Sequence, residues 1–199
     1  MSEQSSELVR RGLMIEYLSL VWMGVESVVA LWAGFWASSL ALLAFGGDSI
    51  IELISSWTVL MYLRRREKAQ TVDEQKAEWA TTLLLFLLVP TIALGLVYSY
   101  LTGVKAESSV LGIGVAVGSV IIMPFLAVEK KRIGAKGNLL PLSIDAVESW
   151  TCFFMSIALL GGLLANYLWN VWWVDSVAAC AILVFILREA FDALKEIRK

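Results

Sequence analysis

One apolar stretch, residues 38–63, limits the possible folds of this chain more than any other feature. It is long enough to cross a bilayer as a helix, yet Asp48 and Glu52 lie near its middle. A single carboxylate in hydrocarbon costs about 2.5–3.5 kcal/mol on insertion scales, so two of them need a compensating partner. One helical turn separates them, which puts both on one face about 6 Å apart, where they can share a divalent cation or hold two protons. The stretch therefore predicts half of an intramembrane metal site.

The rest of the chain is equally apolar, with 59% hydrophobic residues among 199. The apolar runs are long and do not alternate with polar residues, which favours a helical bundle over a β-barrel. We expect an all-α integral membrane protein with six spans, at residues 12–35, 38–63, 79–101, 110–128, 139–164 and 172–187. Residues 1–11 are then a cytoplasmic N-terminal segment, residues 12–188 the transmembrane domain and residues 189–199 a short cytoplasmic tail. We expect the plasma or inner membrane as its location.

The positions of the basic residues predict the orientation of the bundle. Of the 16 Lys and Arg residues, all except Lys105 fall on one side of the predicted membrane. Because Lys and Arg are in excess in cytoplasmic loops, this bias places both termini in the cytoplasm.

Three predicted spans place acids at a similar depth. At about 1.5 Å per residue, Glu52 lies roughly 18 Å from Arg64 at the end of its span, and Glu26 lies roughly 22 Å into the first span. In the fifth span Glu148 lies roughly 15 Å deep and Asp145 about 10 Å deep. No basic side chain is expected in this layer, so the acids must either take up protons or bind cations.

The fifth span repeats the pattern of the second, because Asp145, Glu148 and Cys152 are spaced to share one helix face. The chain has no histidine, so a metal site must use oxygen and sulfur. Thiolates suit zinc or cadmium, and carboxylates also accept harder ions such as manganese. Asp48, Glu52, Glu148 and Cys152 would complete a four-ligand shell.

Three further acids are open to other interpretations. Glu26 is either a protonated, hydrogen-bonding strut or a contributor to the site. Asp145 either belongs to the site or lines its cytoplasmic opening. Asp175, beside Trp172 and Trp173, is interpreted as a helix N-terminal cap among interfacial aromatic residues.

These residues resemble a known family. The segment GFWASSLALLAFGGDSIIELISSWTVLMYLR is similar to the first and second spans of the cation diffusion facilitators. In that family, the second span carries an acidic metal motif that follows a run of small residues. In the fifth span, the family's A-D-A-x-H-x-x-x-D pattern falls on residues 144–152, with Glu148 and Cys152 at the His and Asp positions. The family's Asp-Pro near the sixth span corresponds to Asp175 and Ser176.

The resemblance covers all six predicted spans and implies a transporter with cytoplasmic termini that exports divalent cations by alternating access. The family's cytoplasmic ferredoxin-like domain has no counterpart in this sequence. In this respect the sequence is similar to a short branch of the family. The resemblance also implies a homodimer, and so does the small-residue pattern of the fourth span, with Gly112, Gly114 and Gly118.

We expect the cargo to be zinc, with cadmium or manganese as other candidates, exchanged for protons because both compete for the same ligands. An enzyme is not expected, because the chain shows neither a soluble domain nor a nucleophile and base pair, and no nucleic-acid partner is expected. Two alternatives stay open: a non-transporting membrane module that binds metal or modulates a channel, and a proton or monovalent-cation pathway.

Overall fold

The computed structural model describes residues 3–67, 75–102 and 105–197, and these residues form helices without any strand. The six helices of this described part are α1 (Glu3–Trp36), α2 (Leu40–Glu67), α3 (Gln75–Thr102), α4 (Val110–Gly137), α5 (Leu140–Trp169) and α6 (Trp173–Ile197). Four of them contain segments long and apolar enough to cross a membrane: Ser6–Trp36, Leu40–Arg66, Val110–Gly137 and Leu140–Trp169. Helix α3 contributes a further apolar segment, Phe86–Thr102, within the part of the chain that the structure describes. The predicted all-α bundle of six helices is confirmed.

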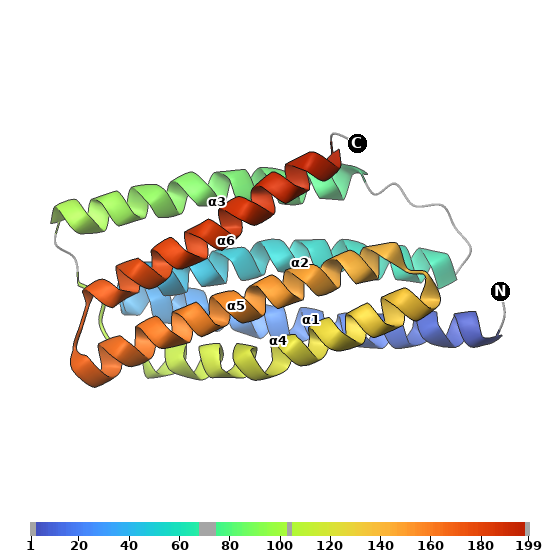
Figure 1. The fold of residues 1–199 in the computed structure, drawn as a ribbon, viewed down its shortest axis with the longest axis horizontal. Helices are drawn as coiled ribbons and strands as arrows, with labels where there is room; N and C mark the ends of the chain where they lie inside the picture. The colour runs from blue at the N-terminus through green and yellow to red at the C-terminus, as the bar shows by residue number, and fades with distance from the viewer. Residues whose placement is uncertain (1–2, 68–74, 103–104, 198–199) are drawn as a thin grey trace.

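Successive helices run in opposite directions, so α1 begins and α6 ends at the same end of the bundle (Figure 1). Helices α1, α2, α4 and α5 form an inner group, in which α1 packs on α2 and α4, and α5 packs on α4 and α2. Helices α3 and α6 pack together along one side of this group, and α6 contacts both α2 and α5. The side of the membrane on which the termini lie stays a prediction.

Close packing of α1 on α2 depends on two glycines. A β-carbon added to Gly46 would lie 2.9 Å from Leu31 Cγ and 3.0 Å from the Leu31 backbone nitrogen. One added to Gly34 would lie 2.9 Å from the Leu43 backbone nitrogen. Small residues let helix backbones approach closely where no water drives association. The pair of glycines thus brings α1 against the face of α2 next to Asp48.

The outward faces of the bundle are apolar. Large hydrophobic side chains are exposed along α1 and α4, among them Val21, Val28, Trp32, Ile121 and Phe125. Such a continuous apolar surface is unfavourable in water and suits contact with lipid tails. The structure therefore has the surface expected of a membrane-embedded bundle.

Helix α4 extends beyond the predicted span, which was expected to end at Val128. It continues to Gly137 and ends at Asn138, whose left-handed conformation (φ 48°) lets its N–H donate to the Gly134 carbonyl. The span predicted to end at Val128 leaves the basic run that starts at Lys130 outside the membrane, but the helix continues through this run, including Gly134. Lys130 is therefore helical and fully buried.

Asp175 acts as a cap, and the helix that it caps is α2. From the first turn of α6, its carboxylate accepts hydrogen bonds from the Ser39 hydroxyl and from the backbone N–H of Leu40 (2.9 Å) and Ala41 (3.4 Å). These amides have no partner within their own helix, so the carboxylate satisfies them. Asp175 thereby ties the start of α2 to α6.

Two of the three glycines of α4 pack against other helices of the same chain. A β-carbon on Gly112 would meet Leu42 of α2 at 2.7 Å, and one on Gly118 would meet the Trp22 ring of α1 at 2.5 Å, whereas Gly114 has nothing within 4 Å. Two of the three residues that suggested a helix contact between protomers thus serve contacts within one protomer. The homodimer stays a prediction.

Candidate metal site

The four predicted ligands come from two neighbouring helices. Asp48 and Glu52 lie on α2, and Glu148 and Cys152 lie on α5, which packs against α2 in the inner group. Asp48, Glu52 and Cys152 are buried, and Glu148 is half-buried. Because each pair is separated by about one helical turn, both members of a pair project from one face.

These side chains lie within electrostatic reach of one another across the α2–α5 interface. The charge of Asp48 interacts with those of Glu52, Glu148 and Glu26, and Cys152 interacts with Asp48, Glu52 and Glu26. Among the described residues, however, no three His, Cys, Asp or Glu side chains converge closely enough to hold an ion. The structure brings the predicted ligands into one region of the core, and their closure around an ion stays a prediction.

Glu52 stands out among the predicted ligands because it is buried without hydrogen-bond partners among the described residues. Neither of its oxygens has a hydrogen-bond partner in the described part of the chain, although both are buried. Leaving a buried polar group unpaired costs about 1–3 kcal/mol, and more when the group is charged. Glu52 therefore retains free coordination capacity in the middle of the bundle.

Glu26, by contrast, is held by donors from four helices. Its Oε1 accepts from Ser49 (2.7 Å) and Cys152 (3.4 Å), and its Oε2 accepts from Trp22 Nε1 (2.8 Å) and Ser119. A carboxylate with two donors on each oxygen has little room for another ligand. The contacts favour a hydrogen-bonding strut next to the site, and the bond to Cys152 joins it to the site directly.

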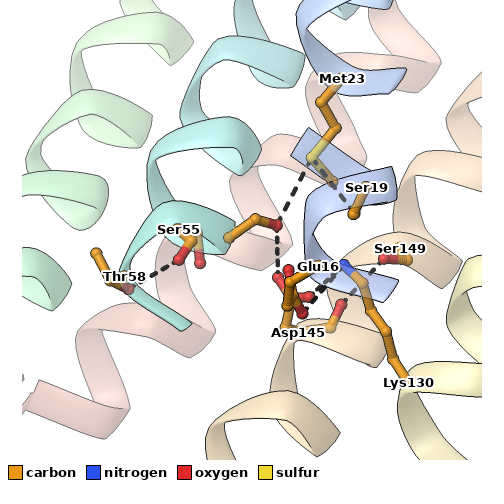
Figure 2. Close-up of polar contacts among 9 residues, drawn as sticks. Glu16, Ser19, Met23, Ser55, Thr58, Lys130, Asp145 and Ser149 are labelled. Atoms are coloured by element: carbon orange, nitrogen blue, oxygen red, sulfur yellow. Dashed lines mark hydrogen bonds and ion pairs between the residues drawn. The ribbon is translucent and has the colours of Figure 1, made fainter. Parts of the chain in front are cut away.

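Asp145 has a basic partner, which corrects the expectation that no cationic side chain enters this layer. Its carboxylate contacts the Lys130 ammonium, and the same ammonium lies 3.7 Å from Glu16 Oε1 (Figure 2). The Ser56 hydroxyl donates to the other oxygen of Asp145 at 2.9 Å. All three charged side chains are buried. Asp145 is thus engaged in an ion pair at one side of the candidate site.

Sequence reasoning missed Glu16 and Lys130. The signal for Lys130 was its register, because Ser119, Met123 and Leu126 precede it on the same helix face and are all buried. Glu16 lies inside the first predicted span, at a shallower depth than the predicted acid layer.

The chain matches the family described as cation efflux transmembrane domain over residues 17–199. It is also similar to the manganese efflux system protein MneS of Bacillus subtilis (strain 168), with 26% identity over 180 residues that cover 86% of this chain and 62% of the relative. The chain therefore spans less than two thirds of the length of that relative. Together with the four long apolar helices, the match over most of the chain shows that this protein is a multi-pass integral membrane protein of the cation efflux family.

Proposed function

We propose that the protein exports a divalent metal cation from the cytoplasm by alternating access, and that Asp48, Glu52, Glu148 and Cys152 bind the ion in transit. The observation that carries the proposal is Glu52, a buried acid with no hydrogen-bond partner in the described structure, next to Asp48. Membership of the cation efflux family and the similarity to a manganese efflux protein support the export of a metal cation.

The charge of the region favours a divalent ion. The proposed ligands are three carboxylates and one thiol carried by α2 and α5, and Lys130 is already paired with Asp145 and Glu16. An ion with two positive charges offsets the cost of keeping carboxylates ionised in the core more effectively than a monovalent ion does.

We further propose zinc as the preferred cargo. Carboxylates accept zinc and manganese alike, whereas a thiolate favours zinc and cadmium over manganese. Cys152 therefore biases the ligand set towards the softer ions, while the three carboxylates leave manganese as a substrate.

Proton exchange follows from the ligand chemistry. Carboxylate and thiolate ligands must lose their protons before they bind a metal, so metal binding releases protons and the affinity for zinc falls as the pH falls. Transport of zinc in one direction is then coupled to transport of protons in the other.

The test is zinc uptake into proteoliposomes that contain a fluorescent chelator, with and without a pH gradient. We expect Asp48→Asn and Cys152→Ala each to lower the transport rate by about tenfold or more, because each removes a ligand. The matched controls are Glu107→Gln and Cys180→Ala, which change an exposed acid and an exposed cysteine.

Unchanged transport in both ligand variants would remove these residues from the mechanism. Tight zinc binding without uptake by the native protein would contradict the transport proposal and favour a non-transporting, metal-binding module.

A further inference from the structure

Three buried charged residues form a second cluster beside the candidate site. Lys130 of α4 lies between Asp145 of α5 and Glu16 of α1, and each of the three side chains is at most 1% exposed. Figure 2 shows the three side chains pointing towards one another. A buried ion pair contributes little net stability, because desolvation of the charges offsets their attraction. Stability alone therefore gives a weak reason for this arrangement.

The cluster has more anionic than cationic capacity. Two carboxylates face a single ammonium, and neither oxygen of Glu16 accepts a hydrogen bond from the described residues. Glu16 Oε1 is 3.7 Å from Lys130 Nζ, which is beyond the range of a direct hydrogen bond. Glu16 thus points at a cation without being satisfied by it.

A neutral hydroxyl group also belongs to the cluster. Ser56 Oγ lies 2.9 Å from Asp145 Oδ1 and 3.6 Å from the Met23 sulfur. Two carboxylates and a hydroxyl are oxygen donors suited to hard divalent cations such as manganese. If the Lys130 ammonium group is left out, the remaining oxygen donors are those of a divalent-cation site.

The cluster lies one helical turn from the candidate metal site. Ser56 follows Glu52 on α2 by about 6 Å of helix rise, and Asp145 precedes Glu148 on α5 by about 4.5 Å. Lys130 and Glu52 also lie within electrostatic reach of each other. This places the cluster between the candidate site and the end of the bundle where α2 ends and α5 begins (Figure 1).

We propose that Glu16 and Asp145 form a second divalent-cation site, which the Lys130 ammonium occupies in this conformation as a tethered competitor. A metal ion that arrives from this end of the bundle binds when Lys130 withdraws, and the return of Lys130 releases it. The place of the site on a transport path rests on the proposed function. The existence of the site does not, because it concerns binding alone.

The test is the number of manganese ions bound per chain, measured by equilibrium dialysis of the purified protein in detergent with radioactive manganese. Lys130→Met removes the competitor, and we expect it to bind one ion more than the native protein does. Lys130→Arg keeps the positive charge and should bind no additional ion. Lys130→Met combined with Asp145→Asn should lose the additional ion again.

The readout is the difference between variants, so it is independent of how many ions the native protein binds. A native protein that binds no ion would contradict the proposed function, and the gain in Lys130→Met would still support the second site. No gain in a Lys130→Met protein that elutes as a single folded species in gel filtration would overturn the second site.

If Lys130→Met does not fold, Glu16→Gln decides, since it leaves the Lys130–Asp145 pair intact. The second site predicts a severalfold rise in the KM for manganese uptake, with an unchanged equilibrium affinity of the deeper site. A fall in unfolding temperature with an unchanged KM would show a structural cluster and overturn the proposal.

Discussion

Substitution of Glu26 separates a structural role of this residue from a ligand role. Glu26→Leu removes the acceptor of four hydrogen bonds, which come from Trp22, Ser49, Ser119 and Cys152. Hydrogen bonds between membrane helices average about 0.6 kcal/mol each in double-mutant cycles, so the four together contribute about 2–3 kcal/mol.

The loss of stability in Glu26→Leu is limited because two of the donors have another acceptor nearby. Without Glu26, the single hydroxyl hydrogen of Ser49 can bond to the Phe45 carbonyl oxygen at 2.9 Å, and that of Ser119 to the Val115 carbonyl oxygen at 3.0 Å. The cost therefore should not exceed the sum of the lost bonds. For a chain of 199 residues, a loss of this size lowers the unfolding temperature by about 5–10 °C.

The assay is thermal unfolding in detergent, followed by tryptophan fluorescence, together with calorimetric zinc binding at a temperature where each variant is folded. We expect Glu26→Leu to unfold about 5–10 °C earlier, with Glu26→Gln in between because its amide oxygen still accepts hydrogen bonds. Zinc affinity should change little in either. Glu107→Gln, at an exposed position, is the control. Native-like unfolding with loss of zinc binding would refute the strut and make Glu26 a ligand.

Two further substitutions test individual contacts. Cys152→Asp replaces the soft ligand by a hard one, so we expect the ratio of zinc to manganese affinity to fall on the order of tenfold, or about 1.4 kcal/mol; an unchanged ratio in competition calorimetry would exclude Cys152 as a ligand. Asp175→Ala removes the cap of α2 and should cost about 1–3 kcal/mol. Faster amide hydrogen exchange at Leu40 and Ala41 would report that loss, and native exchange rates there would show that the cap is not formed in solution.

The architecture was predictable because bilayer thickness fixes helix length and because the apolar runs are separated by polar ones. The register of Asp48 and Glu52 on one helix face followed from helix geometry alone. The structure confirms the helical bundle that these patterns predicted.

The partners of the buried charges were harder to predict. Lys130 stands in a run of charged residues that is typical of a loop, and only its register with the buried Met123 and Leu126 places it in the core. The contact of Asp175 with Ser39 joins residues that are remote in sequence, so no local spacing encodes it. Long-range pairings of this kind depend on how the helices pack, and the hydrophobic pattern does not specify which polar side chains will meet.

The most direct test of the account is the position of a bound ion. A crystal structure with cadmium, located by its anomalous scattering, should show a peak between Asp48 and Glu52 of α2 and Glu148 and Cys152 of α5. Absence of a peak there at a cadmium concentration that saturates transport, or a peak that these four side chains do not touch, would contradict the account.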